Sequence, residues 1–325
     1  MMAASASFRP CLQGHAKRTA GAVVLFCCLV LFFPSYLAPR GPPPSSRLKV
    51  QPLALHTAPE VILPGSRAAF ARQQAAATRL LAEMRSKPDD WEHDCLHRPT
   101  SALWIDPFRD FYHCPAPVEK IGSLSDGGKW VCGLETLLQI PGCVVYSFGS
   151  NGDTAFEEAI LEYTSCSVFT FDPTLNDTQS ARVAAVPAVT FSPIGLSDAD
   201  GLLTIKGKPR PVRTLQSLMQ ENGHSHVDLI KIDIEGGEWS ALDGMIAGGK
   251  RLPLTQALIE FHVIQPQSSI ETMAGLQALG MQAFHVEENN YCTTCYNTKA
   301  RGKYYEVSFA NTHKDGSLFL RPQQG

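Results

Sequence analysis

Short apolar runs alternate with longer helical stretches through the chain after Cys143. Seven of these runs read as strands. Strands separated by helices form a mostly parallel sheet that is covered on both faces. The last two runs are joined by a polar, cysteine-rich segment with no room for a good helix, which predicts a final antiparallel strand. The predicted strands are Cys143 to Phe148, Val168 to Phe171, Ala188 to Phe191, Asp228 to Ile232, Ala257 to Phe261, Gln282 to Val286 and Tyr304 to Phe309.

Residues 1–38 have the order of features found in a targeting segment. Lys17 and Arg18 precede an unbroken apolar stretch from Ala20 to Phe33. This stretch is shorter than the roughly 18 residues expected of a membrane-spanning helix, and it matches the apolar core of a signal peptide. We therefore expect a signal peptide and a secreted or lumenal protein of the secretory pathway. A type II membrane anchor that extends through Leu37 is the alternative.

Composition divides the rest of the chain into three parts. Residues 39–65 are rich in proline and read as a flexible stem. Residues 66–115 read as a helical, cysteine-containing cover, with a helix that runs to about Ser86. Residues 116–325 contain the predicted sheet. The segment from Trp91 to Cys132 has no clear apolar period, and no strand is predicted in it.

Ten cysteines are many for a cytosolic protein of this size. In an oxidising lumen some of them should pair, so we expect at least one disulfide bond. The candidates are Cys95, Cys114 and Cys132, or Cys292 with Cys295.

The net charge of −3 gives no indication of the basic surface that binds phosphates, so a nucleic-acid partner is not expected. The N-x-S/T triplet Asn176-Asp177-Thr178 is compatible with a glycoprotein exposed to the lumen, although such triplets also arise by chance.

A glycine-rich turn follows the first predicted strand. The sequence FGSNGD leads into a helix, so Gly149, Ser150 and Gly152 form a tight turn at the helix start. Such a turn points backbone N–H groups and a helix N-terminus at a negatively charged group of a ligand. Asp172 ends the second strand about 20 residues later, where a carboxylate can accept the hydroxyls of a ribose. Together they predict a nucleoside site, whereas the alternative is that Asp172 only starts a turn with Pro173.

The sequence FSPIGLSDADG follows the third strand and passes beside the expected position of the base. Ile194 would line an apolar slot there, and Ser197 or Asp198 would meet the base amine. Two alternatives stay open. One is a plain hairpin with Asp200-Gly201 as its turn. The other is the D-x-D pattern of metal-dependent glycosyltransferases, formed by Asp198 and Asp200.

The strongest local pattern is DLIKIDIEGGEW. A buried strand that carries Lys231 releases Asp233, Glu235 and Glu238 at the carboxyl end of the sheet, where open α/β sheets bind ligands. Clustered carboxylates at this edge can share a proton, hold a divalent ion or act as a base toward a hydroxyl. Asp233 and Glu235 are therefore predicted to be catalytic, whereas Glu238 also suits a structural charge at a helix N-terminus.

The sequence LIEFHV ends the fifth strand with Glu260 and His262 near the same edge. A histidine has a pKa suited to taking a proton from a hydroxyl, so His262 is a further catalytic candidate. The more common role of such a histidine is that of a hydrogen-bonded core group.

These motifs carry a family resemblance. KIDIEGGEW, with the upstream FGSNGD and the TLQSL helix, resembles the FkbM-type methyltransferases, and IGSLSDGGKWVCGLE with CVVYSFGSNGDTAFE is similar to the animal methyltransferase-like proteins. The resemblance covers roughly residues 110–312. It implies a Rossmann-like class I methyltransferase fold, with S-adenosylmethionine as cofactor and a hydroxyl acceptor. The cofactor-binding residues would be Gly149, Ser150 and Gly152 at the methionine carboxylate, Asp172 at the ribose, and Ile194 and Ser197 at the adenine.

One position departs from the family pattern. The usual first motif begins with an acid that binds the cofactor amine, and here that position falls within Tyr146-Ser147. Asp126 or Asp153 would have to substitute for it.

The resulting expectation is an O-methyltransferase that acts on a small-molecule or glycan hydroxyl. No metal site is predicted, although Asp233 and Glu235 leave metal dependence open. The two alternatives are a catalytically inactive binding module with this fold, favoured by the missing acid, and a metal-dependent glycosyltransferase.

Overall fold

The computed structural model describes residues 108–110, 112–248, 251–262, 266–289, 304–313 and 316–319, together with some residues between 72 and 86. Contacts divide the chain after Leu53, and every described residue belongs to the second unit. The described residues between 72 and 86 are helical, as predicted. No helix among the described residues is long and apolar enough to cross a membrane. The predicted targeting segment, the stem, Cys95, Cys292 and Cys295 lie outside the described residues.

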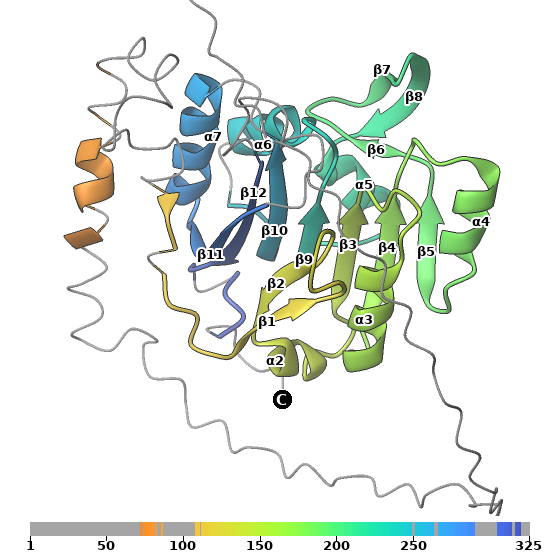
Figure 1. Ribbon diagram of the computed structural model, residues 1–325, viewed down its shortest axis with the longest axis horizontal. Helices are drawn as coiled ribbons and strands as arrows, with labels where there is room; N and C mark the ends of the chain where they lie inside the picture. The colour runs from red at the N-terminus through yellow and green to blue at the C-terminus, as the bar shows by residue number, and fades with distance from the viewer. Residues whose placement is uncertain are drawn as a thin grey trace, which may run out of the picture. The chain divides into compact units, whose positions relative to one another are not determined.

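A seven-stranded sheet forms the centre of the described domain (Figure 1). The strand order is β11-β12-β10-β9-β3-β4-β5, and β12 runs antiparallel to both of its neighbours. The remaining pairs in this sheet are parallel. The prediction of a mostly parallel sheet of seven strands with a final antiparallel strand is therefore confirmed. The strands are β3 (Val144–Phe148), β4 (Ser167–Phe171), β5 (Val189–Ser192), β9 (Val227–Ile232), β10 (Leu254–His262), β11 (Met281–Glu288) and β12 (Tyr304–Asn311).

Both faces of the sheet are covered by helices or by the hairpin described below. Successive side chains of a strand point to opposite faces, so one strand can contribute to two apolar clusters. Along β3, Tyr146 and Phe148 pack into one apolar cluster and Val145 into the other. The first cluster includes side chains of α5 (Leu215–Glu221), α6 (Glu238–Ala247) and α7 (Pro266–Ala278). The second includes side chains of α2 (Leu134–Leu138) and α3 (Ala155–Tyr163). A further helix, α4 (Asp177–Ala184), lies beside β5.

A hairpin that the sequence did not predict completes the second face. It consists of β1 (Val118–Ile121) and β2 (Lys129–Cys132), and β2 contacts β10 and β12 (Figure 1). A disulfide bond joins Cys132 to Cys114, and the side chain of Gln256 hydrogen-bonds both the N–H and the C=O of Cys132. Two hydrogen bonds from β10 thus attach the hairpin to the sheet, and the disulfide ties it to the segment that precedes β1.

Two disulfide bonds lie among the described residues. The bond between Cys114 and Cys132 is one of the predicted pairings. The bond between Cys143 and Cys166 was not predicted. These two cysteines directly precede the parallel neighbours β3 and β4, so their proximity follows from strand register and is invisible in the sequence.

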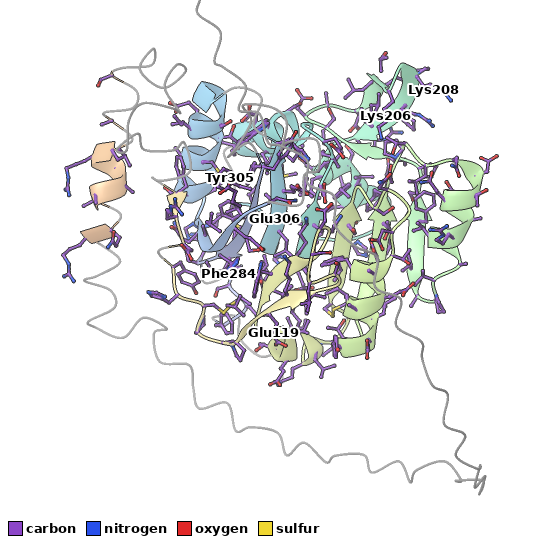
Figure 2. The ribbon with its side chains drawn as sticks, viewed as in Figure 1. Glu119, Lys206, Lys208, Phe284, Tyr305 and Glu306 are labelled. Carbon is purple, nitrogen blue, oxygen red and sulfur yellow. A yellow bond between two sulfur atoms is a disulfide. The ribbon has the colours of Figure 1, made fainter. Side chains whose placement is uncertain are left out.

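A small sheet of β6 (Gly195–Leu196), β8 (Lys208–Arg213) and β7 (Gly201–Ile205) stands beside the main sheet. The hairpin alternative for this segment is correct, but its predicted turn is wrong. The turn is Lys206-Gly207, and both residues have positive φ, as a tight hairpin turn of this hand requires. Figure 2 shows Lys206 and Lys208 at the outer end of this hairpin.

Candidate active site

The glycine loop after β3 has the left-handed backbone that its sequence predicts. The φ angles are 80° at Gly149, 50° at Asn151 and 79° at Gly152. A Cβ atom at Gly149 would collide with the carbonyl oxygen of Asp233, so only glycine fits there. Lys231 donates to the carbonyl of Gly149 over 2.9 Å. The glycine loop and the acidic turn after β9 therefore form one continuous surface at the carboxyl edge of the sheet.

Asp172 lies at the carboxyl end of β4, next to this loop. Its side chain is almost fully buried and accepts hydrogen bonds from the N–H of Asn151, the N–H of Thr174 and the hydroxyl of Thr174. These bonds fix the glycine loop against β4. They are compatible with the turn alternative as well as with the ribose role, because a carboxylate has about four acceptor sites and three are used.

The predicted adenine residues lie where the chain crosses from β5 to the small sheet. Ile194 is half-buried and packs against the main core. Ser197 is buried and donates to Asp198 over 2.9 Å. Asp200 accepts from the N–H of Thr214 and from Ser217, both at the start of α5. Asp198 and Asp200 therefore have separate local partners, which is unlike a shared metal site.

The EGG turn after β9 holds Glu235 in a strained conformation. Its φ is 59°, which is uncommon for a residue with a side chain and often marks a functional position. The carboxylate of Glu238 is fully buried and accepts from the N–H groups of Ile234 and Gly236, which fixes the turn. The geometry therefore supports a structural role for Glu238, at the N-terminus of α6.

His262 connects this turn to β10. Its Nδ1 lies 3.0 Å from Oε1 of Glu238, and its Nε2 lies 3.6 Å from Oε2 of Glu235. Burial would lower the pKa of His262, but the hydrogen bond and the charge of Glu238 outweigh burial and raise the pKa to about 9. The imidazole is therefore protonated at neutral pH, which does not suit the proton acceptor that the sequence suggested.

A buried lysine that the sequence did not single out lies at the centre of the acidic residues. The Nζ of Lys129 is 2.6 Å from Glu306, 3.3 Å from Asp233 and 3.7 Å from Glu260. These three acids come from β12, from the turn after β9 and from β10. Lys129 has 1% of its surface exposed, so its ammonium depends on these carboxylates for stabilisation.

The pKa values of Asp233 and Glu260 are shifted in opposite directions. Burial would raise the pKa of Asp233, but the charges of Lys231 and Lys129 outweigh it and lower the pKa to about 2. Burial, followed by the charges of Asp233 and Glu306, raises the pKa of Glu260 to about 8. At neutral pH, Asp233 is thus ionised and Glu260 protonated.

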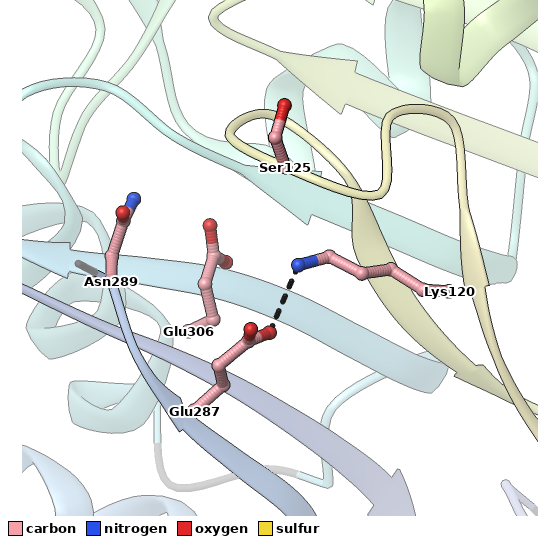
Figure 3. Close-up of a pocket in the computed structure, with 5 residues that line it drawn as sticks. All are labelled: Lys120, Ser125, Glu287, Asn289 and Glu306. Carbon is pink, nitrogen blue, oxygen red and sulfur yellow. Dashed lines mark hydrogen bonds and ion pairs between the residues drawn. The ribbon is translucent and has the colours of Figure 1, made fainter. Parts of the chain in front are cut away.

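A small pocket opens beside these acids, between the β1–β2 hairpin and the ends of β11 and β12 (Figure 3). Lys120 forms an ion pair with Glu287 at 3.0 Å, and Asn289 donates to Glu260 over 2.8 Å. The Oε2 atom of Glu306 is buried and has no hydrogen-bond partner among the described residues. The pocket residues are Lys120, Ser125, Glu287, Asn289 and Glu306.

The missing acid falls within Tyr146-Ser147, and both residues are fully buried. The hydroxyl of Tyr146 lies 2.8 Å from Nδ1 of His224, whereas that of Ser147 lacks a hydrogen-bond partner among the described residues. The two acids suggested as substitutes, Asp153 and Asp126, already accept hydrogen bonds within the protein. The carboxylate of Asp153 accepts from the N–H of Ala155 at the start of α3, and that of Asp126 accepts from Asn289.

A family model described as a methyltransferase domain matches residues 71–301, the greater part of the chain. The chain belongs to this family of methyltransferase domains. S-adenosylmethionine is the cofactor that this assignment supports.

Two curated relatives are each named probable methyltransferase-like protein 24. The human protein is 27% identical over 126 residues, which are 38% of this chain and 34% of the relative. The rat protein is 27% identical over 136 residues, 41% of this chain and 37% of the relative. The chain thus aligns with little more than a third of the length of either relative. The resemblance to animal methyltransferase-like proteins is confirmed.

Among solved structures, similar chains include a fibrillarin pre-rRNA processing protein from Methanococcus jannaschii, with a TM-score of 0.34, 10% identity, and coverage of 53% of this chain and 67% of that one. Another is a putative tRNA (m1A22) methyltransferase from Streptococcus pneumoniae in complex with S-adenosylmethionine, with a TM-score of 0.33, 14% identity, and coverage of 55% and 71%. These scores are too low to support an argument about function.

The residues predicted to bind S-adenosylmethionine lie together at the carboxyl edge of the sheet. The left-handed loop from Gly149 to Gly152 packs closely on the protein, since a Cβ at Gly149 would meet the carbonyl of Asp233 and one at Gly152 would meet the side chain of Gln179. Asp172 keeps one acceptor position for a ribose hydroxyl. At the amine end, neither Tyr146 nor Ser147 supplies the usual acid.

Proposed function

We propose that this domain is an S-adenosylmethionine-dependent O-methyltransferase that acts on a hydroxyl acceptor in the secretory pathway or outside the cell. The observation that carries the proposal is the direct contact between the glycine loop and the acidic turn. The backbone of Gly149 packs on the carbonyl of Asp233, and the Asp233 carboxylate is ionised at neutral pH. A methyl donor on one side of this contact and an acceptor on the other would be neighbours.

The cofactor, when bound, supplies a methyl group on a positively charged sulfur that is open to attack by oxygen. Asp233 is the acid that can accept a hydrogen bond from the acceptor hydroxyl, because it is ionised and its side chain is 18% exposed. Asp233 would orient the acceptor oxygen toward the methyl group, and the proton of the hydroxyl would leave to water as the oxygen gains positive charge. Because the lowered pKa of Asp233 makes it a weak proton acceptor, catalysis would be chiefly orientation.

Glu235 and His262 frame the acceptor side of the turn. The side chain of Glu235 is 78% exposed and reaches toward His262, so it can close over an acceptor. The protonated His262 holds Glu235 and Glu238 together and adds a positive charge near Asp233. In this proposal His262 is a positioning residue.

The pocket beside Glu306 supports a polar acceptor. It combines the ammonium of Lys120 and the hydroxyl of Ser125 with carboxylate oxygens of Glu287 and Glu306. A hydroxyl group both donates and accepts, and the pocket has room for about one water molecule, so it could hold a single hydroxyl group of an acceptor but not a whole sugar.

The secretory location is supported by the leader and by the two disulfide bonds, since stable disulfides are rare in the cytosol. Non-reducing mass spectrometry of protein purified from secreting cells should find Cys114 linked to Cys132 and Cys143 linked to Cys166. Recovery of a reduced, unprocessed chain from cytosol would refute the location.

The activity is tested by incubating the purified protein with S-adenosylmethionine that carries a tritiated methyl group and with a panel of neutral glycosides. The expected label is stable to mild alkali, because a methyl ether survives conditions that hydrolyse a methyl ester. Label that is released by alkali would mean transfer to a carboxylate, and the hydroxyl proposal would be wrong.

One observation favours a second function, a binding module without catalysis. Neither Tyr146 nor Ser147 supplies the acid at the amine end, which removes one charged contact to the cofactor. This alternative predicts no turnover with any acceptor, and it predicts weak or absent binding of the cofactor. The separate partners of Asp198 and Asp200 give no support to a glycosyltransferase.

A further inference from the structure

Three acidic side chains from separate parts of the sheet surround the ammonium of Lys129. Glu306 and Glu260 are directly opposite each other in the β12–β10 pair, and Asp233 follows the neighbouring strand β9. Their oxygens lie 2.6, 3.7 and 3.3 Å from Nζ. The lysine itself comes from β2, more than one hundred residues earlier in the chain. Figure 2 shows Glu306 inside the domain.

This arrangement has the chemistry of a divalent-cation site. Hard cations such as Mg²⁺, Mn²⁺ and Ca²⁺ bind clustered carboxylate oxygens. Ligand oxygens of Asp233 and Glu260 lie within 4.8 Å of each other. In this structure the position among the acids belongs to the lysine ammonium.

A second observation is an acceptor that the ammonium leaves without a partner. The Oε2 atom of Glu306 is buried and has no hydrogen-bond partner among the described residues. An ammonium offers three donors, whereas a hydrated metal ion takes six or more oxygen ligands. Removing the lysine would therefore leave a set of acceptors that a metal ion can satisfy better than the lysine did.

We propose that Lys129 is the built-in cation of the acceptor site, occupying the place of a divalent metal ion and holding Asp233 in position for the acceptor hydroxyl. Its role at the acceptor rests on the proposed function, but the exchange of lysine for metal does not. Lys129 touches neither the reacting atoms nor the glycine loop, so it is a positioning residue. The domain accordingly needs no divalent ion to keep this site assembled.

The anchoring of β2 fits this role. Cys132, at the end of β2, is fixed by its disulfide to Cys114 and by two hydrogen bonds to Gln256. A mobile strand could withdraw the lysine from the acids, whereas this strand is held against the centre of the sheet. Lys129 therefore lies on a strand that is attached to β10 at its other end.

The test uses Mn²⁺ as a probe, with binding followed by electron paramagnetic resonance on the full-length protein. Lys129→Ala should bind one Mn²⁺ with a dissociation constant of about 10⁻⁴ M, in the range of modest carboxylate sites. The second substitution Glu306→Gln in that variant should weaken binding at least tenfold. The matched control is Lys120→Ala, which removes a lysine of the same hairpin that faces Glu287, and which should gain no Mn²⁺ site.

The wild-type protein should have no Mn²⁺ site that depends on Glu306. Any Mn²⁺ that it binds should bind equally well to the Glu306→Gln variant. A site in the wild type that depends on Glu306 would overturn the proposal, because the ion would then coexist with the lysine. A Lys129→Ala protein that gains no Mn²⁺ site, or that does not fold even with Mn²⁺ present, would also overturn it. Mn²⁺ binding requires neither cofactor nor acceptor, so failure of the methyltransferase proposal would leave this result unchanged.

Discussion

The Nζ atom of Lys129 lies 2.6 Å from Oε1 of Glu306, and 177 positions separate the two residues in the chain. The first is on the hairpin that covers the sheet, and the second is on its antiparallel strand β12. This single contact joins the cover to the acids at the carboxyl edge. It also explains why both residues are buried although each carries a charge.

Replacing Lys129 with methionine keeps the length of the side chain and removes its charge. Because buried acidic side chains then lose their cationic partner, we expect the free energy of unfolding to fall by about 3–5 kcal/mol. Urea unfolding at pH 7 measures this loss. Lys120→Met is the control, since its partner Glu287 is one-third exposed and the expected loss is only about 1 kcal/mol. Equal losses in the two variants would contradict a special role for Lys129.

Asp172→Ala should weaken binding of S-adenosylhomocysteine by roughly tenfold, because it removes the proposed ribose ligand and a bond that fixes the glycine loop. Thr174→Val separates these effects, since it removes the hydroxyl bond to Asp172 and leaves the carboxylate in place. Calorimetric titration should find nearly unchanged affinity in Thr174→Val. If Asp172→Ala also binds normally, Asp172 is only a turn residue.

The raised pKa of Glu260 makes stability depend on pH. Its pKa is about 8 in the folded protein against 4.5 for a glutamate exposed to water, so the folded state holds a proton that the unfolded state has lost between these pH values. The contribution of Glu260 is therefore fully present below pH 4.5 and is lost as pH rises through 8. Glu260→Gln cannot titrate, and its unfolding free energy should fall less than that of the wild type between pH 5 and 8. Parallel pH profiles would mean that Glu260 titrates normally.

The main sheet could be predicted because each strand is a compact apolar run. Along β3 and β9 every residue is buried, and such strands read as near-continuous apolar segments. The hairpin β1–β2 could not be predicted, because its strands are four residues long and contain the charged residues Lys120 and Lys129. Their environment depends on partners far away in the chain.

The candidate site was predictable in part. The pattern KIDIEGGEW pointed to Asp233 and Glu235, since three acids after a buried strand are unusual. Lys129 follows two glycines and reads as a loop lysine, and Glu306 lies in a strand where alternate residues are expected to be exposed. The raised pKa of His262 depends on Glu238, which the sequence placed at a helix start and not against β10.

The central claim is that Asp233 acts on the acceptor and not on the cofactor. The most direct measurement compares the wild type with Asp233→Asn and Glu235→Gln, using calorimetric titration of S-adenosylmethionine and the tritium transfer assay on the same preparations. We predict cofactor affinities within about threefold of the wild type and methyl transfer reduced by at least about 10²-fold in Asp233→Asn, as expected for a group that acts on the reacting hydroxyl. Loss of cofactor binding in a folded Asp233→Asn protein, or unchanged transfer, would contradict the claim.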